Sequence, residues 1–295
     1  MRFTSKLGAA LAVAVVSVGA ATQVAAASAE AEQTYRDIEK TLGIVPQFFR
    51  EFPEWAIGPA WAEMKGLQMN PKTQLSGKTK ELIGLAVAAQ IPCTYCVYFH
   101  TEIAKANGAT EDELKHALAE ASLTRHWSTI INGAGLDEGE FRSEMKRVAE
   151  FMKKNPRQTA SAPVKDARGA LADIEKTWGF VPTFMKHVPE PALVGAWNEM
   201  KAVEGNPKAP LDPNTVSLIG LAVAAQVPCS YCVIADTEFA TLGGATNRQK
   251  SEAVAVAAIV RHWSTFLNGA QIDERRFKSD VDAIVANMKR PAVGR

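Results

Sequence analysis

The sequence predicts an all-α fold made of two tandem helical domains that form a pseudo-two-fold pair. Two local observations support the helices. Apolar residues recur at helical spacing through most of the chain, and no stretch alternates apolar and polar residues with the period of two typical of a half-buried strand. Helix starts and stops such as Thr110 and Asn70-Pro71 separate the apolar segments. An internal repeat supports the tandem arrangement.

The internal repeat runs without a gap along each half of the chain. Asp37-Ile38-Glu39-Lys40-Thr41 reappears as Asp173-Ile174-Glu175-Lys176-Thr177, an offset of 136 residues. The same offset relates Arg125-His126-Trp127 to Arg261-His262-Trp263. A constant offset indicates duplication of one domain, so the first and second copies should share one fold.

The repeat and the composition divide the chain into four parts. We expect an N-terminal domain over residues 32–154, a linker over residues 155–167 that is polar and contains prolines, and a C-terminal domain over residues 168–291. Residues 1–29 combine a basic start, an uncharged run rich in Ala and Val, and a small-residue exit, which is typical of a cleavable secretory signal peptide. We therefore expect export, to a periplasm or outside the cell. A transmembrane anchor is the alternative interpretation.

The charge balance and the cysteines narrow the class of protein. The formal net charge is +1 with acids and bases interspersed, which argues against a nucleic acid or an anionic membrane as partner. All four cysteines lie in the pairs Cys93/Cys96 and Cys229/Cys232. In an oxidising compartment each pair should therefore rest as its own short-loop disulfide until a partner reduces it.

The helices of the first copy are expected in a definite order. Residues 51–69 form an amphipathic helix that ends at Asn70-Pro71, and residues 75–90 form the next, with Ser76 as N-cap. Residues 92–106 follow, closed by a left-handed cap at Asn107-Gly108.

Two further helices complete the copy. One is capped by Thr110, with Glu113 in the capping-box position, and closes at Asn132-Gly133. The other covers residues 138–153. The second copy should repeat all of these elements.

The third helix carries the residues with chemical potential. Pro92 has no amide hydrogen and a fixed φ, so we expect it at the first helical position, with Cys93 and Cys96 in the first turn. The unpaired amides and the positive end of the helix dipole favour a thiolate there. His100 follows Cys96 by four residues and shares its face, and the helix of Glu81 can fold back toward the imidazole. These are the parts of an activated, self-resolving cysteine.

This pattern resembles the alkylhydroperoxidase D-like branch of the carboxymuconolactone decarboxylase family. The resemblance rests on Glu81, on Cys93-Thr94-Tyr95-Cys96, on His100 and on Asn107-Gly108-Ala109-Thr110. It implies an all-α fold in which a helical hairpin carries the redox pair, and a thiol-dependent peroxidase activity. Members of the family also commonly form symmetric oligomers.

The resemblance further implies a role for each residue. Glu81 and His100 would deprotonate Cys96 through a water, Cys96 would attack the hydroperoxide, and Cys93 would resolve the resulting sulfenic acid as a disulfide. A thiol or dithiol reductant is the implied partner. The sequence contains no nucleotide or flavin motif, and we expect neither a cofactor nor a metal.

The second copy departs from this pattern. Ser217 aligns with Glu81, and Asp236 aligns with His100. A charged carboxylate one turn after Cys232 should raise the pKa of the thiol by repulsion, so we expect a slower thiol or a disulfide that only exchanges electrons. Asp236 could act as a weak base if burial raised its own pKa.

Several alternatives stay open at this stage. Cys93, Cys96 and His100 suit Zn²⁺, although only Glu81 could complete four ligands. Each disulfide could be purely structural, although so short a loop constrains the unfolded chain little. A thioredoxin fold would need a strand before the cysteines, where a helix is expected.

Two alternatives concern function directly. The chain could be a dithiol adaptor that passes electrons to a separate peroxidase. It could also be a decarboxylase, since Lys78 and Lys80 lie near Glu81, although nothing clusters like a clamp for a substrate carboxylate.

Three other residues complete the candidates. His126 could line the redox pocket, although helix packing explains it equally well. Tyr95 could also contact a substrate, although the edge of the pocket is the simpler position for an amphipathic ring. His116 is expected on a solvated helix face.

Overall fold

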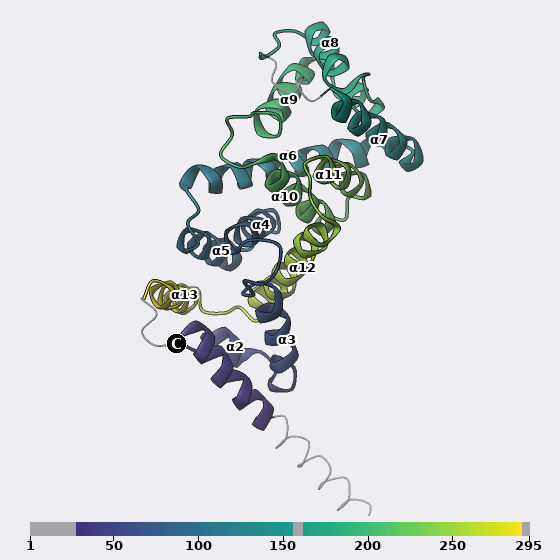
Figure 1. Cartoon of the computed structure of the whole chain (residues 1–295). Coiled ribbons are helices and arrows are strands. Elements are labelled where there is room, and N and C mark those ends of the chain that lie inside the picture. The colour runs from purple at the N-terminus through teal and green to yellow at the C-terminus, as the bar shows by residue number, and fades with distance from the viewer. Residues whose placement is uncertain (1–27, 156–161, 291–295) are drawn as a thin grey trace, which may run out of the picture. The chain divides into compact units, whose positions relative to one another are not determined.

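The computed structural model describes residues 28–155 and 162–290 (Figure 1). All regular secondary structure in these ranges is helical, with no strand, which confirms the all-α prediction. No helix in these ranges combines the length and the hydropathy of a membrane span. The expected signal peptide lies outside the described residues except for its last two positions.

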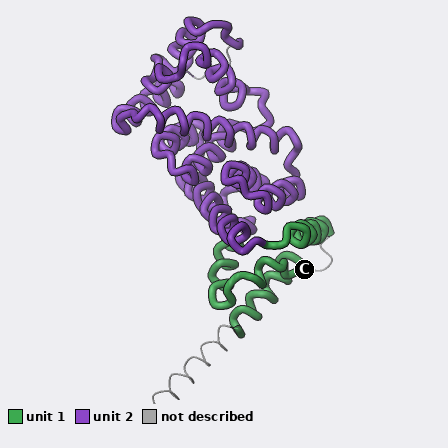
Figure 2. The backbone as a smooth tube through the Cα atoms, turned by 180° about the vertical axis from the view of Figure 1, so that it is seen from behind, with its two compact units in different colours: residues 1–66, 272–295 green, residues 67–271 purple. Residues whose placement is uncertain are grey.

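The chain forms two compact units that do not follow the repeat (Figure 2). Unit 1 combines the beginning of the first copy, up to Gly66, with the end of the second, from Ile272. Unit 2 covers Leu67–Gln271. The compact units therefore divide the chain at residues 66–67 and 271–272, and not at the linker expected between the copies. The domain boundaries expected from the repeat stay a prediction.

Unit 1 contains the helical residues 28–42, α2 (Gln47–Glu51), α3 (Glu54–Leu67) and α13 (Glu274–Met288). The helix expected over residues 51–69 is present as α3, but with shorter bounds. Its start is later because Glu51 ends α2 and Pro53, which has no amide hydrogen to donate, separates the two helices. The core of unit 1 is formed by buried side chains, namely Tyr35, Ile38, Leu42, Phe48, Phe49, Ile57, Trp61, Phe277, Val281 and Ile284.

Unit 2 contains helices from both copies. From the first copy come α4 (Gly77–Gln90), α5 (Thr94–Ala106), α6 (Glu111–Ala134) and α7 (Glu138–Lys154). From the second come α8 (Ala167–Trp178), the 3-10 helix η1 (Thr183–His187), α9 (Glu190–Val203), α10 (Pro213–Gln226), α11 (Ser230–Leu242) and α12 (Asn247–Gly269).

The centre of unit 2 is a four-helix packing of α4, α6, α10 and α12. The two nearly wholly buried helices, α4 and α10, pack on each other, α4 also packs on α6 and α12, and α10 does the same. The cysteine helices then pack on these, α5 on α4 and α11 on α10. Exchanging the two copies therefore reproduces the main contacts, as expected for a pseudo-two-fold pair.

Side-chain caps fix where these helices begin. Ser76 accepts a hydrogen bond from the Thr79 amide at the start of α4, and Thr110 forms a full capping box with Glu113 at the start of α6. Both caps were predicted. The expected closure at Asn132-Gly133 is wrong, because α6 continues to Ala134 and ends at Gly135, which adopts φ +61°.

The two copies also brace each other's loops. His116 on α6 accepts a hydrogen bond from the Leu211 amide at 3.1 Å and donates one to the Val203 carbonyl at 2.8 Å. In the corresponding place on α12, Glu252 accepts from the amides of Gln74 and Leu75. The expectation that His116 is solvated is therefore wrong, because packing of the copies buries it.

Candidate functional site

Both cysteine pairs form the expected short disulfides, Cys93–Cys96 and Cys229–Cys232, and all four residues are buried. Cys93 is the N-cap of α5 and its Sγ accepts a hydrogen bond from the Cys96 amide at 3.2 Å. The sequence predicted Pro92 as the first helical residue, and this prediction is wrong, because α5 starts at Thr94. A sulfur replaces the usual oxygen cap, and only Cys96 lies within the first turn.

Glu81 and His100 form a buried hydrogen bond between α4 and α5. The Glu81 Oε2 atom lies 2.7 Å from His100 Nδ1, and the two residues are 3% and 6% exposed. Gln68 Nε2 donates to the other carboxylate oxygen of Glu81 at 2.7 Å. The sequence interpretation identified the acid and the imidazole, but it missed Gln68, whose amide holds the carboxylate in place.

A glycine makes this contact possible. A Cβ atom on Gly84, one turn beyond Glu81 on α4, would overlap the ring of His100. The absence of a side chain lets the imidazole lie directly on the backbone of α4. His100 is one turn beyond Cys96 on α5, so the fold places the acid–imidazole pair on the helix face that also carries the sulfur.

The two lysines near Glu81 are both engaged elsewhere. Lys80 is 1% exposed, and its ammonium donates to the carbonyls of Leu67 and Asn70 and to Thr73 Oγ1. Burial lowers the pKa of Lys80. Lys78 pairs with Glu113 at 2.6 Å. Lys80 therefore fixes the segment that carries Gln68.

The two candidate pocket residues lie in different surroundings. Tyr95 is partly buried in the first turn of α5. His126 is exposed on α6, with its ring edge-on to Trp127 at a centroid distance of 5.2 Å. The structure therefore does not bring His126 into the buried Glu81–His100 pair.

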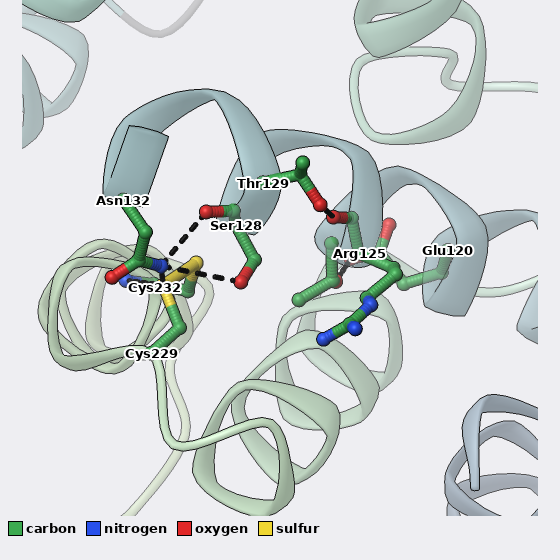
Figure 3. The surroundings of a disulfide bond; sticks show 8 residues. Glu120, Arg125, Ser128, Thr129, Asn132, Cys229 and Cys232 are labelled. Atoms are coloured by element: carbon green, nitrogen blue, oxygen red, sulfur yellow. Dashed lines mark hydrogen bonds between the residues drawn. A yellow bond between two sulfur atoms is a disulfide. The ribbon is translucent and has the colours of Figure 1, made fainter. Parts of the chain in front are cut away.

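The second cysteine pair is built from both copies (Figure 3). Its cysteines lie at the start of α11, and polar side chains of α6, from the first copy, lie beside them. Asn132 Nδ2 donates to Cys229 Sγ at 3.4 Å and to the Ser128 carbonyl at 2.7 Å. The alignment of the copies gives no indication of this contribution.

Two carboxyl groups meet where the first site has its acid and imidazole. A Cβ on Gly220, the counterpart of Gly84, would lie 2.8 Å from Glu120 Oε1 and 3.0 Å from Asp236 Oδ1. Glu120 is 2% exposed and belongs to α6. Ser217, aligned with Glu81, donates its hydroxyl to the Pro213 carbonyl. The missing acid of the second copy is therefore replaced by an acid from the first.

Burial changes the titration of this group. It raises the pKa of Glu120 and of Asp236 well above their usual range, and the neighbouring Glu204 raises both further. Burial also raises the pKa of Glu204 to about 7. The raised pKa of Asp236 favours its protonated form, which weakens the charge repulsion expected against Cys232.

Comparison with known proteins identifies the family. The model of the "Carboxymuconolactone decarboxylase family" matches residues 56–138 and 191–274, one match in each copy. A crystal structure from Burkholderia xenovorans LB400, provisionally described as a gamma-carboxymuconolactone decarboxylase subunit, aligns with a TM-score of 0.52 and 17% identity. The alignment covers 88% of this chain and 98% of that chain, and shows a shared fold.

No curated protein matches the chain. The two family matches together span more than half of its length, and their spacing reproduces the internal repeat. The chain therefore belongs to the carboxymuconolactone decarboxylase family, as a member with two tandem copies.

Proposed function

We propose that the chain is a thiol-dependent peroxidase of the alkylhydroperoxidase D type, acting through its first cysteine pair. The observation that carries the proposal is the buried Glu81–His100 hydrogen bond, one helical turn beyond Cys96. A carboxylate on Nδ1 fixes the tautomer in which Nε2 accepts a proton. His100 then takes the thiol proton of Cys96, directly or through a water.

The proposed reaction begins with the reduced pair. The Cys96 thiolate attacks a peroxide oxygen, the O–O bond breaks, and an alcohol or water leaves, so that Cys96 becomes a sulfenic acid. The Cys93 thiol attacks that sulfur, water leaves, and the Cys93–Cys96 disulfide forms, which is the bond present in the structure. A dithiol reductant then returns two electrons and two protons.

The contacts of the lysines weigh against a decarboxylase. Holding a substrate carboxylate would require a cation that is not already paired. Lys80 is committed to backbone carbonyls and Lys78 to Glu113. The peroxidase accounts for Glu81, His100 and both sulfurs, whereas decarboxylation uses none of the sulfur chemistry.

The N-terminal sequence supports an exported enzyme. Residues 1–29 have the composition of a cleavable signal peptide. In an oxidising compartment the pair would need a thiol or dithiol reductant to return to its active form. We therefore include export and such a reductant in the proposal.

The test is peroxide consumption by the pre-reduced protein alone, with hydrogen peroxide and an alkyl hydroperoxide as substrates. We expect one equivalent to be consumed rapidly, and a sulfenic acid on Cys96 to be detected by mass spectrometry in the Cys93→Ser variant. Cys96→Ser should abolish turnover, whereas Cys232→Ser should leave most of it. If Cys96 oxidises no faster than a free thiol, only the dithiol adaptor remains.

A further inference from the structure

The second disulfide separates two cavities within unit 2. Cys229 and Ser230 line an open groove of about 380 Å³, which Arg142 and Glu238 also border. Cys232 lines a smaller cavity of about 50 Å³ on a different side, together with Asp236 and Glu204. Both cysteines are buried, Cys229 at 0% and Cys232 at 5% exposure, but they border different cavities: Cys229 borders the groove, and Cys232 borders the cavity that contains Asp236 and Glu204.

Two acids near the inner cavity each have one oxygen without a hydrogen-bond partner among the described residues. Glu120 Oε2 and Asp236 Oδ2 are closed off from solvent and form no hydrogen bond, while Glu120 Oε1 accepts from Thr124 Oγ1 at 3.1 Å. An ionised carboxylate in such a place is costly, whereas a neutral carboxyl group tolerates it. The geometry therefore favours protonated side chains at both positions.

No cation balances these acids among the described lining residues. The titratable groups that face Asp236 are Glu120 from α6 and Glu204 at the end of α9. The other walls of the cavity, from α6, α7, α8, η1, α9 and α11, are Thr124 and apolar side chains such as Phe141 and Trp178. Proton exchange in this cluster therefore involves only carboxyl groups, because no described lysine, arginine or histidine lines the cavity.

Glu204 connects the inner cavity to a wider one. It also lines a cavity of about 560 Å³, bordered by Trp178, Trp197 and Lys201. Part of its surface is exposed. A proton that reaches Glu204 from this side has a route to Asp236, which faces Cys232 one helical turn away on α11.

We propose that the second cysteine pair is a separate thiol–disulfide exchange site, in which Asp236 donates the proton that Cys232 takes up when the bond is reduced. Glu204 and Glu120 are positioning residues in this arrangement, since Glu204 keeps Asp236 protonated and restores its proton from the wider cavity, and Glu120 lies beside Asp236 over Gly220. Because Glu120 and Asn132 come from the first copy, the site exists only when both copies pack together. The inference goes beyond the peroxidase and does not depend on it.

The step balances with a small dithiol as reductant. One of its thiolates attacks Cys229 Sγ from the open groove, a mixed disulfide forms, and the electron pair of the broken S–S bond goes to Cys232 Sγ, which takes the proton of Asp236. The second thiol of the reductant then attacks the reductant sulfur that is bonded to Cys229. The reductant closes as a cyclic disulfide, and Cys229 leaves and takes the proton of the attacking thiol. The proton lost when the first thiol ionised returns to Asp236 through Glu204.

The test follows the reduction of each pair separately in the full chain. The oxidised protein is mixed with dithiothreitol between about pH 5.5 and about pH 8.5, quenched, alkylated and digested, so that mass spectrometry reads each cysteine pair on its own peptide. Rates are divided by the thiolate fraction of dithiothreitol. For the second pair, we expect the corrected rate to fall as the pH rises through the pKa of Glu204, about 7.

Three variants decide the outcome. Asp236→Asn should slow the second pair by at least about tenfold at low pH and flatten its profile, because an amide is not a proton donor. Glu204→Gln should move the fall in rate to lower pH, since Glu204 raises the pKa of Asp236. Ser122→Ala, exposed on α6, should change nothing.

The first pair is the internal control and should keep its rate in all three variants. A wild-type rate and profile for the second pair in Asp236→Asn would overturn the proposal. So would equal slowing of both pairs, which would indicate a general loss of structure. If Asp236→Asn does not fold, the displacement of the profile in Glu204→Gln decides, and an unmoved profile rejects the proposal. None of these readings uses peroxide, so the two proposals can fail independently.

Discussion

Glu81 Oε2 and His100 Nδ1 lie 2.7 Å apart between two packed helices, with no more than a few per cent of either residue exposed. Gln68 occupies the second oxygen of the carboxylate. An imidazole held in this way has one fixed tautomer and one free nitrogen for proton transfer. The reactivity of Cys96 should therefore depend on the charge of Glu81 rather than on its shape.

Glu81→Gln tests this dependence, because glutamine keeps the size of the side chain and removes the charge. We expect the alkylation rate of reduced Cys96 at neutral pH to fall about 10–100-fold, the range of general-base assistance or just below it. The measurement is the rate of reaction with iodoacetamide as a function of pH. Glu111→Gln, at an exposed position on α6, is the control. An unchanged rate in Glu81→Gln would reject the relay.

Gly84→Ala tests the close approach of α4 to His100. The added methyl group would overlap the imidazole, so the ring must move or the helices must separate. We expect a loss of about 1–3 kcal/mol in the free energy of unfolding, together with slower alkylation of Cys96. Urea titration and iodoacetamide kinetics measure the two effects.

Gly133→Ala is the matched control for that variant. Gly133 is also helical, but nothing lies within 4 Å of the position of its Cβ. Alanine there should stabilise the protein slightly, by up to about 1 kcal/mol, because it favours the helix more than glycine does. If both glycine variants behave alike, the packing of His100 on Gly84 has no functional weight.

The first site was largely predictable from the sequence because its parts are local. Cys96 and His100 share one face of a helix by their spacing, and Glu81 lies on the preceding helix, which needs only to fold back on its neighbour to reach the imidazole. The cap was less predictable. Whether Pro92 or Cys93 precedes the first helical residue depends on backbone geometry that helical patterns define only to within one or two residues.

The second site was not predictable in the same way. Aligning the copies showed that Ser217 and Asp236 replace the relay, and it also aligns Glu204 with Gln68, a signal that the sequence interpretation did not use. Glu120 has no such signal, since its role arises only from the packing of α6 on α10. Contacts between copies also explain why His116 is buried rather than solvated.

Lys80→Met tests whether the buried ammonium holds the segment of Gln68 in place. Methionine fits the volume but leaves the carbonyls of Leu67 and Asn70 without their donor. We expect a loss of about 2–3 kcal/mol in the free energy of unfolding, and slower alkylation of Cys96 as Gln68 loosens. Lys78→Met removes a partly exposed ion pair with Glu113 and should cost no more than about 1 kcal/mol. Equal effects of the two variants would contradict the structural role of Lys80.

The buried acids predict how stability depends on pH. Below about pH 4.5, Glu204 is protonated in both the folded and the unfolded chain, so it makes no difference to stability. Between about pH 4.5 and its folded pKa of about 7, the unfolded chain releases the proton and the folded chain keeps it. Stability therefore falls as the pH rises through this window, and the contribution of Glu204 levels off above it. Asp236 and Glu120, whose pKa values are also raised, act in the same direction.

Glu204→Gln isolates this term, because glutamine has no proton to retain. We expect the wild type to lose on the order of 3 kcal/mol more than the variant between about pH 5 and about pH 8. Urea midpoints of the oxidised protein at several pH values measure the difference, with Glu190→Gln on the same helix, α9, as a control for the loss of one exposed carboxylate. Parallel pH profiles for the wild type and Glu204→Gln would mean that Glu204 ionises freely in the folded protein. In that case Glu204 would not hold a proton at neutral pH that it could pass to Asp236.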